Sequence, residues 1–450
     1  MTKLFGTDGI RGRSGSFPID GEGARKIGAA IARSLTKLSP SAPSVVIGRD
    51  TRKCGGELQE NLCLGLSSLG VGAVCAGVCP TPAVVSLLLA GGADAGIMIS
   101  ASHNPPQYNG FKVFNSEGMK IPESLEDEIQ GGFEKMKNSP PPSGGAAPPE
   151  NSAWREIYSS GLNASVPGGR DLSGVKVSLD CANGATSEIA PEVFDKTGAK
   201  ITSIGREPDG NNINSGCGSL DTERLGEEVR RSGAAFGAAL DGDGDRIAFC
   251  DERGNEVDGD LIIALFAREM LESGKLKKPR VVTTVMSNKG LELFLEDIGI
   301  EVVRTDVGDR NVAEMMKKEA VNFGGEKSGH LIFSDHSTNG DGLLSALLAA
   351  DILKKKNTPL SGALPEFELF PQVLKNVRVA RREPFASMDG LSSAVARREK
   401  QLGKSGRIHI RYSGTEPLAR VLVEGENAPS VMETADEISE IIDKNAGERS

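Results

Sequence analysis

The segment DGDGD holds the densest group of reactive side chains in the sequence. Asp241, Asp243 and Asp245 alternate with glycines, so the backbone is able to curl and bring three carboxylates onto one hard cation. Carboxylates this close repel one another unless a cation or an arginine compensates their charge, and Arg246 follows directly. Mg²⁺ binds through few carboxylates and keeps coordination sites for a phosphate oxygen, so the pattern favours Mg²⁺.

Two other interpretations of this segment stay open. Glu252 falls at the twelfth position from Asp241, as in an EF-hand calcium loop, but the sixth position is Arg246 rather than glycine and the flanks have strand patterns. The other interpretation is a solvated acidic turn, although an apolar strand leads straight into the segment.

The segment ISASHNP, residues 99–105, places one hydroxyl beside a histidine. The apolar run before it has the length of a strand, and Pro105 and Pro106 cannot continue a strand or lie inside a helix. We therefore expect Ser102 on a loop at a strand end, next to His103, where it suits a nucleophile or a phosphorylated serine. Taken alone, the pair is more typical of a polar turn, and only the other loops change that interpretation.

Two further loops have the composition of phosphate-binding sites. FGTDGIRGRSG, residues 5–15, offers backbone amides with Arg11 and Arg13, but it lacks the GxxxxGKS spacing of a nucleotide-binding P-loop. RYSGTEP, residues 411–417, combines groups that suit a dianionic phosphate: the Arg411 guanidinium, the Ser413 and Thr415 hydroxyls and the Gly414 amide. A simple turn remains the alternative for each loop.

The loop GGEKSGH supplies Glu326, Ser328 and His330, side chains that hydrogen-bond to sugar hydroxyls, although alone it is a weak signal. The combination of loops is more specific than its parts. A serine on a loop, a carboxylate group for a metal, a hydroxyl-binding loop and a phosphate clamp are what phosphoryl transfer on a sugar phosphate requires.

Strands and helices alternate along the chain so that these loops follow strands. This alternation predicts an α/β fold with mostly parallel sheets, in which function gathers at the carboxyl ends of strands. The strand at 109–114 is expected to bring Lys112 near the serine. The other expected strands include residues 44–48, 71–77, 175–180, 235–240, 280–285, 301–305 and 321–325, with helices including 58–69, 81–90, 220–232, 259–273 and 288–298.

The domain organisation follows from composition and pattern. Residues 138–152 are rich in Pro, Gly and Ser and are interpreted as a surface linker. No fixed-period repeat occurs, so the successive units have similar architecture without forming an array. The expected boundaries give α/β units at residues 1–150, 151–256 and 257–366, and a smaller α+β domain at 367–450.

Composition limits the possible partners. The chain has 450 residues with 25% charged and 38% hydrophobic residues and a net charge of −10, so nonspecific nucleic-acid binding is not expected. The apolar stretches are broken by Gly and Asp, and the N-terminus has no apolar signal region, so we expect no membrane association. The 7 cysteines form no CxxC pair and are expected to be reduced and buried in a cytoplasmic protein.

Taken in order, the motifs resemble those of the α-D-phosphohexomutases over nearly the whole length. They are FGTDGIRG, GRDTR, ISASHNP, DGDGDR, VGDR, GGEKSGH followed by FSDHSTNGDGLL, and RYSGTEPLARVLVEGE. The resemblance implies three similar α/β domains and a smaller C-terminal domain around a central cleft. It also implies a resting phosphoserine at Ser102.

The resemblance carries further roles to matching residues. Asp241, Asp243 and Asp245 would hold one Mg²⁺ per chain, with a phosphoserine oxygen as a further ligand. His103 or Lys112 would transfer the proton. The remaining implied roles are lining of the reacting phosphate by Arg11, His103, Lys112 and Arg246, reading of sugar hydroxyls by Glu326, Ser328 and His330, and binding of the other phosphate by Arg411, Ser413, Gly414, Thr415 and Arg420.

Within the family, FGTDGIRG and GDGLL look more like the members that act on glucosamine phosphates than those that act on glucose or mannose phosphates. This implies interconversion of glucosamine 6-phosphate and glucosamine 1-phosphate through a 1,6-bisphosphate. The reaction would lie on the route to UDP-N-acetylglucosamine and cell-wall precursors. We expect the protein to be a monomer or homodimer. The alternatives are a phosphomannomutase/phosphoglucomutase, a metal-dependent phosphatase and a non-catalytic sugar-phosphate sensor.

The sequence departs from the family pattern in a few places. Tyr412 stands where the family often has Pro or Lys, KCGG follows GRDTR where a Ser-Gly pair is common, and the Pro-rich linker is unusual. The mutase hypothesis requires Ser102 to face the carboxylates in one charged hollow. Separation of Ser102 from the aspartates, or burial of either beneath packed side chains, would contradict it.

Overall fold

The structure, a computed structural model, describes residues 3–6, 8–38, 42–166, 171–413 and 416–447. The α/β class predicted from the sequence is confirmed. The chain divides into two compact units, one of residues 1–278 with 307–364 and the other of residues 279–306 with 365–450.

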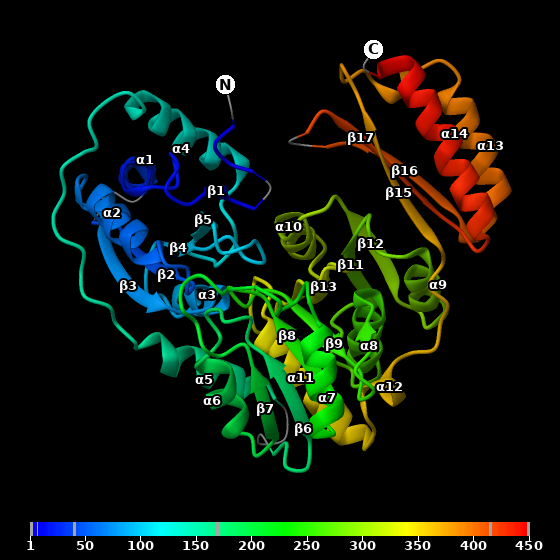
Figure 1. Cartoon of the computed structure of the whole chain (residues 1–450), viewed down its shortest axis with the longest axis horizontal. Helices are drawn as coiled ribbons and strands as arrows, with labels where there is room; N and C mark the ends of the chain where they lie inside the picture. The colour runs from blue at the N-terminus through cyan, green and yellow to red at the C-terminus, as the bar shows by residue number, and fades with distance from the viewer. Residues whose placement is uncertain (1–2, 7, 39–41, 167–170, 414–415, 448–450) are drawn as a thin grey trace. The chain divides into compact units, whose positions relative to one another are not determined.

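The first sheet has the strand order β1-β5-β4-β2-β3 (Figure 1). Strands β4, β2 and β3 are parallel, whereas β5 returns antiparallel to β4 and pairs with β1 at the edge. Helices α1, α2 and α4 share an apolar core with one face of the sheet, and α3 packs on the other face. The bounds are β1 Ile10–Arg13, α1 Gly21–Leu38, β2 Ser44–Arg49, α2 Gly55–Ser67, β3 Gly72–Val78, α3 Thr81–Leu89, β4 Ala95–Ile99, β5 Tyr108–Asn115 and α4 Glu123–Met136.

The second sheet repeats this arrangement in the order β10-β9-β8-β6-β7. Strands β7, β6 and β8 are parallel, and β9 returns antiparallel to β8. Similar architecture in successive units is therefore confirmed. The bounds are α5 Trp154–Ser165, β6 Lys176–Asp180, α6 Ile189–Asp195, β7 Lys200–Ile204, α7 Glu223–Ser232, β8 Phe236–Leu240, β9 Ile247–Cys250 and β10 Glu256–Val257.

The segment that follows contributes to both compact units. Strands β13 and β14 form an antiparallel pair in the first unit, and β11 and β12 form a parallel pair in the second. The bounds are α8 Gly259–Glu272, β11 Arg280–Thr284, α9 Lys289–Asp297, β12 Glu301–Thr305, α10 Asp309–Glu319, β13 Phe323–Gly325, β14 Leu331–Phe333, α11 Gly342–Lys356 and α12 Leu360–Ala363.

The C-terminal segment forms the antiparallel sheet β15-β17-β16, which packs against α13 and α14 around its own apolar core. This confirms the small α+β fold predicted for the end of the chain. The bounds are β15 Gln372–Arg378, η1 Phe385–Ser387, α13 Leu391–Leu402, η2 Gly403–Ser405, β16 Arg407–Tyr412, β17 Leu418–Glu424 and α14 Ala428–Ala446.

Several helices begin where a short polar side chain caps the first turn. Asp258, Asn288, Asp341 and Asn427 each accept a hydrogen bond from a backbone amide two or three residues later, at the starts of α8, α9, α11 and α14. Such caps satisfy amides that have no partner within the helix. The local sequence therefore determines where these helices start.

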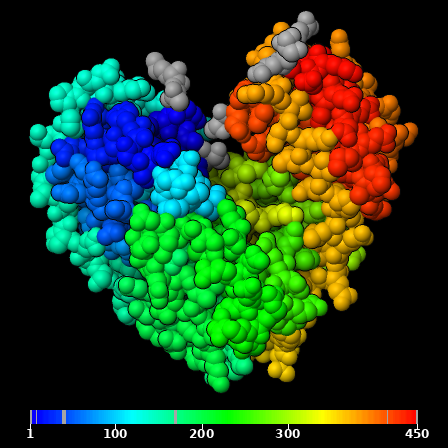
Figure 2. All heavy atoms as spheres, in the orientation of Figure 1, coloured from blue at the N-terminus to red at the C-terminus, as the bar shows by residue number. Residues whose placement is uncertain are grey.

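The Pro-rich segment at 138–152 forms no regular helix or strand and lies at the surface, as predicted (Figure 2). All of the cysteines are free thiols, and all except the half-buried Cys54 are buried, which also agrees with the prediction. Among the described residues, none of the helices combines the length and apolar character needed to cross a membrane.

Candidate active site

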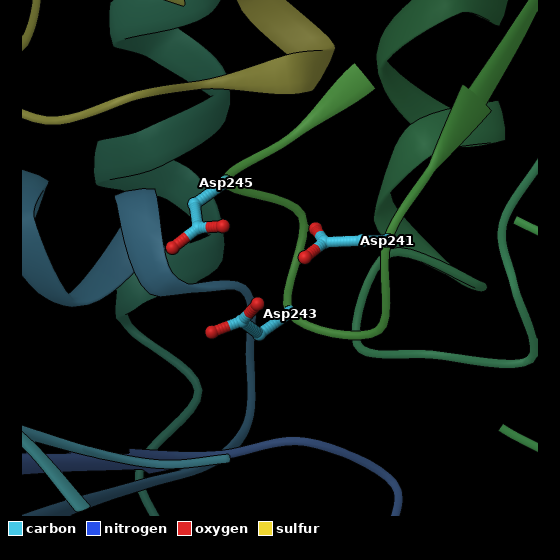
Figure 3. Close-up of side chains that lie close together, drawn as sticks. All are labelled: Asp241, Asp243 and Asp245. Atoms are coloured by element: carbon cyan, nitrogen blue, oxygen red, sulfur yellow. The ribbon is translucent and has the colours of Figure 1, made fainter. Parts of the chain in front are cut away.

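The segment between β8 and β9 forms a compact group of carboxylates (Figure 3). Oxygen atoms of Asp241, Asp243 and Asp245, here called the carboxylate triad, lie within 4.8 Å of one another, and all three side chains are buried. Gly244 has φ +72°, a backbone conformation that glycine adopts without strain. The predicted convergence of the carboxylates is therefore present.

Lys112 compensates much of the charge of the triad. Its Nζ donates to Asp243 Oδ2 at 2.7 Å and to Asp245 Oδ2 at 2.5 Å. Burial opposes the charged ammonium, but Asp243 and Asp245 outweigh it and hold the pKa of Lys112 well above its usual value. Burial, together with Asp245 and Asp243, raises the pKa of Asp241 well above its usual range.

The donor set of the triad fits a hard cation. Asp243 Oδ1 and Asp245 Oδ1 are buried and accept no hydrogen bond from any described residue, so two oxygens remain for a ligand. Carboxylate oxygens are the atoms that Mg²⁺ and Ca²⁺ prefer. The EF-hand alternative is not supported, because antiparallel strands flank the segment and Glu252 instead accepts hydrogen bonds from Ser361. Burial likewise contradicts the solvated turn.

The serine loop, residues 100–107, joins β4 to β5, and Ser102 lies on it as predicted. Ser102 Oγ donates to Asp241 Oδ2 at 2.6 Å and lies 3.2 Å from Nδ1 of His103. Burial, followed by the positive charges of Arg246, Arg11 and Lys112, lowers the pKa of His103 to about 4, so the imidazole is neutral at pH 7. The expected proximity of the serine to the carboxylates is present.

Among the described residues, the charged hollow expected around Ser102 is absent, because the side chains are packed together. Ser102 is 0% exposed, and so are Asp241 and Asp243. The physical reason is that charged and polar groups of different domains pair here instead of leaving a hollow. The Lys112 ammonium donates to Asp243, and the Ser102 hydroxyl donates to Asp241. His103, beside Ser102, is only partly buried.

A second set of charged residues extends this cluster and was missed in the sequence. Asp8 accepts hydrogen bonds from Arg11 and Lys120, and Lys120 also donates to Asp309 Oδ1 at 2.7 Å. Burial opposes ionisation of Asp309, but Lys120 lowers its pKa to about 2. Asp8 belongs to the FGTDGIRG motif and Asp309 to the VGDR motif. The sequence could have indicated these two residues only because each motif contains one aspartate.

Arg246 also borders the triad. Its backbone amide donates to Asp241 Oδ1 at 3.1 Å, while its buried Nε has no hydrogen-bond partner among the described residues. Although burial opposes the charge, Asp245 and Asp241 raise the pKa of Arg246. Arg11 is half-buried beside the serine loop, where its Nη1 donates to Asn104 Oδ1 at 3.4 Å. The structure thus brings Arg11, His103, Lys112 and Arg246 to the same cluster.

The loop predicted to bind sugar hydroxyls connects β13 to β14 and packs beside the triad. Gly329 O accepts a hydrogen bond from Ile247 N, directly after the triad segment. Glu326 Oε1 accepts from Gly308 N at 3.0 Å, and Ser328 is exposed. Glu326 is therefore already hydrogen-bonded inside the protein, whereas Ser328 is open to solvent.

His330 is buried and turned toward the carboxylates. Its Nε2 accepts a hydrogen bond from Gly340 N at 3.1 Å, and its Nδ1 lies 3.8 Å from Asp245 Oδ1. Nε2 also lies 3.5 Å from Asp309 Oδ2. Nε2 is thus engaged by a backbone amide, and the imidazole lies between the carboxylates of Asp245 and Asp309.

The predicted phosphate clamp belongs to the second compact unit. Arg411 and Arg420 are opposite each other in the β16–β17 register, and burial followed by Arg420 lowers the pKa of Arg411. Arg420 donates to Glu416 at 2.9 Å, and Ser413 is buried. Two facing guanidinium groups suit an anion. Gly414 and Thr415 lie outside the described residues.

Tyr412, one of the departures from the family pattern, lies on the other side of its strand from Arg411, because successive side chains of a strand alternate. Its ring stacks on Phe385 with 4.3 Å between centroids, and its hydroxyl donates to Glu383 O. Tyr412 therefore points away from Arg411.

Models of four domains of one protein family match successive parts of the chain. The matches are phosphoglucomutase/phosphomannomutase α/β/α domain I at residues 2–139, domain II at 156–254, domain III at 258–370 and the C-terminal domain at 374–441.

Curated relatives match over almost the full length. A phosphoglucosamine mutase of Desulfotalea psychrophila is 44% identical over 447 residues, covering 98% of this chain and 99% of the relative. A phosphoglucosamine mutase of Geotalea daltonii is 43% identical and covers 99% of both chains.

Solved structures agree on the fold. A phosphoglucomutase/phosphomannomutase family protein from Burkholderia thailandensis has a TM-score of 0.79 at 23% identity, covering 99% of this chain and 98% of that one. An Aspergillus fumigatus N-acetylphosphoglucosamine mutase in complex with GlcNAc-6P and magnesium has a TM-score of 0.64 at 17% identity, covering 99% and 96%.

Proposed function

Because this chain belongs to the phosphoglucomutase/phosphomannomutase family, we propose that it interconverts glucosamine 6-phosphate and glucosamine 1-phosphate, with Ser102 carrying the phosphoryl group. The observation that carries the proposal is the 2.6 Å contact between Ser102 Oγ and Asp241, which places a hydroxyl against a buried group of carboxylates. The curated relatives named for the same reaction support the choice of sugar.

The reaction is a pair of phosphoryl transfers. The C1 hydroxyl of glucosamine 6-phosphate attacks the phosphorus of phosphoserine 102, so the bond to Oγ breaks and a 1,6-bisphosphate forms. The bisphosphate then turns end for end, and Ser102 Oγ takes the 6-phosphoryl group and releases glucosamine 1-phosphate. Positioning and charge stabilisation account for most of the catalysis of such transfers.

We propose His103 over Lys112 for proton transfer, because the two side chains differ in charge. The neutral His103 imidazole is able to accept the proton of the attacking hydroxyl, whereas Lys112 holds its own proton at pH 7. His103 therefore fits the acceptor, and Lys112 fits a cation that stabilises the negative phosphoryl group. Burial of Ser102 counts against the mutase hypothesis as framed from the sequence, but the matches to all four family domains and to full-length relatives outweigh it. We therefore expect His103 and Lys112 to move aside when the sugar phosphate enters.

One Mg²⁺ per chain is proposed at the carboxylate triad, with an oxygen of phosphoserine 102 as a further ligand. When bound, Mg²⁺ offsets negative charge on the transferring group. Arg11 and Arg246 hold that phosphate through their guanidinium groups.

Contacts to the rest of the substrate are proposed from the two remaining loops. Glu326, Ser328 and His330 are proposed to bind sugar hydroxyls. His330 also lies close to Asp245 and accepts a hydrogen bond from Gly340 N, so it would act at the border between the sugar and the carboxylate triad. The proposed contacts to the phosphate that is not being transferred are Arg411, Ser413, Gly414, Thr415 and Arg420.

The wider description of the protein is also a proposal. We propose a cytoplasmic monomer or homodimer that feeds the route to UDP-N-acetylglucosamine, with domains at residues 1–150, 151–256, 257–366 and 367–450. The free thiols and the net charge of −10, which disfavours nucleic-acid binding, support this placement.

Turnover of glucosamine 6-phosphate and mannose 6-phosphate by the purified chain, with a trace of the matching bisphosphate, tests the substrate. Preference for the glucosamine compound is expected, and a strong mannose preference would overturn the assignment. Steady release of inorganic phosphate without isomerised sugar would indicate a phosphatase instead.

Intact mass spectrometry tests the role of Ser102. A fraction of the protein should be heavier by one phosphoryl group, and Ser102→Ala should abolish both that fraction and the mutase activity. Ser116→Ala, at an exposed serine of the same domain, is the matched control and should retain both. Full mutase rate in Ser102→Ala would show that the phosphoryl group is carried elsewhere.

A further inference from the structure

Arg52, at the end of the GRDTR motif, uses every donor of its guanidinium inside the protein. Its Nη1 donates to Pro105 O at 2.5 Å and Tyr108 O at 2.9 Å, and its Nη2 donates to Ser102 O at 3.0 Å and Asn104 O at 2.7 Å. The side chain is fully buried. A guanidinium has five N–H donors in a fixed planar fork, and four of them here hold carbonyls of the serine loop and the first residue of β5.

The fifth donor of Arg52 connects it to the serine loop through two further side chains. Its Nε donates to Asp50 Oδ2 at 2.9 Å, and the same oxygen accepts a hydrogen bond from Ser100 Oγ at 2.6 Å. Ser100 Oγ in turn accepts from Ser102 N at 2.8 Å. The amide and the carbonyl of Ser102 are therefore both fixed by a network that starts at Arg52.

Ser102 needs such support because its backbone is in the left-handed region, with φ +54°. This conformation costs a residue with a side chain on the order of 1 kcal/mol, so the surroundings must maintain it. Holding it directs Oγ at Asp241. Asn214, from the second sheet's domain, adds Nδ2 hydrogen bonds to Ser102 O at 2.8 Å and Asn104 O at 3.1 Å.

From this geometry we propose that Arg52 is a positioning residue for phosphoryl transfer, which holds the serine loop so that Ser102 Oγ faces the carboxylate triad. The inference rests on the proposed function. Among the residues that the structure describes, Arg52 contacts none that are assigned to the sugar or to the phosphate that is not transferred, so its loss should lower kcat and leave KM unchanged. Misplacement of a reacting group by about 1 Å is enough to lower a rate on the order of 100-fold.

The decisive variant is Arg52→Lys. Lysine keeps the positive charge beside Asp50, but its three donors radiate from one atom and cannot reach carbonyls on both sides of the fork. Arg49→Lys is the matched control, because Arg49 belongs to the same motif and pairs with Glu150 of the linker instead. Each variant is measured for kcat, KM, the phosphorylated fraction by intact mass, and the midpoint of thermal unfolding.

We expect kcat of Arg52→Lys to fall roughly 100-fold with KM unchanged and a smaller phosphorylated fraction, while Arg49→Lys stays within about twofold of the wild type. A kcat of Arg52→Lys within about threefold of the wild type would overturn the inference, as would a rise in KM with kcat preserved.

Asn214→Ala decides the matter if Arg52→Lys does not fold. It removes donors to the same two carbonyls while Arg52 remains, so kcat should fall about tenfold with KM unchanged, and an unchanged kcat would contradict the positioning role of the network. Wild-type protein without mutase activity or a phosphorylated fraction would refute the proposed function itself. An active wild type with an equally active Arg52→Lys would refute only this inference.

Discussion

Replacement of Lys112 by methionine should expose how much the carboxylate triad depends on one ammonium group. Methionine keeps the length and apolar stem of the side chain but removes the charge 2.5–2.7 Å from Asp245 and Asp243. Breaking a buried ion pair by removing one partner costs about 3–5 kcal/mol. Total stabilities lie near 5–15 kcal/mol, so in chelator the variant should unfold at a clearly lower urea concentration.

Mg²⁺ should reverse most of this loss. A ligand that binds only the folded state stabilises it by about 2.7 kcal/mol at one hundred times its dissociation constant. In the wild type Mg²⁺ must compete with the Lys112 ammonium for Asp243 and Asp245. The variant lacks this competitor and should also bind Mg²⁺ more tightly than the wild type. Fluorescence of Trp154, the only tryptophan, reports unfolding of the same compact unit.

Lys26→Met is the matched control. Lys26 is equally buried in the same unit, but it pairs with Glu22 and with Lys137 O, and it makes no contact with the triad. Its destabilisation should therefore be the same with chelator and with Mg²⁺. The reasoning is refuted if Lys112→Met is as stable as the wild type in chelator. It is also refuted if Mg²⁺ does not reduce the difference in unfolding free energy between Lys112→Met and the wild type.

Other predictions concern the residues around the site. Gly242→Ala would place a Cβ 2.8 Å from Ser102 O and 2.7 Å from Ile213, so we expect a loss of about 1–3 kcal/mol of stability and a lower kcat, measured by urea unfolding and turnover. Burial raises the pKa of Asp341 to about 6, above its unfolded value of 3.8, so its contribution to stability is present below pH 3.8 and is lost as pH rises toward 6. Between pH 5 and pH 7 the wild type should therefore lose about 1 kcal/mol more stability than Asp341→Asn, and parallel pH profiles would contradict this. Asp243→Asn should abolish stabilisation by Mg²⁺ in a thermal melt, and an unchanged response would place the cation elsewhere.

The parts of the site that were predictable are those encoded over a few neighbouring residues. The alternation of Asp and Gly from Asp241 to Asp245 gave the convergence of carboxylates, because each side chain is held within one tight segment. The apolar run ending in a proline-bounded loop placed Ser102 correctly. Both depend on local backbone rules that a single sequence contains.

The parts that were not predictable are pairings across domains. Lys112 was expected near the serine, but its contacts with Asp243 and Asp245 join positions more than a hundred residues apart. The bridge from Asp8 through Lys120 to Asp309 is of the same kind. Nothing in one sequence tells which buried acid meets which buried base, and so the burial of Ser102 was also missed.

The charges of the described cluster give a reason why phosphate and divalent cation should bind together. The carboxylates of Asp8, Asp309 and the triad face the cationic groups of Arg11, Lys112, Lys120 and Arg246, so charge is nearly balanced within the protein. A phosphoryl group on Ser102 adds about two negative charges. In a buried site that addition is costly unless a divalent cation arrives with it, because charges removed from water must be paired. Phosphorylation of Ser102 should therefore strengthen Mg²⁺ binding, and by reciprocity bound Mg²⁺ should shift the equilibrium toward the phosphorylated protein. An equal Mg²⁺ affinity of the phosphorylated and unphosphorylated proteins, measured by calorimetry, would contradict this coupling.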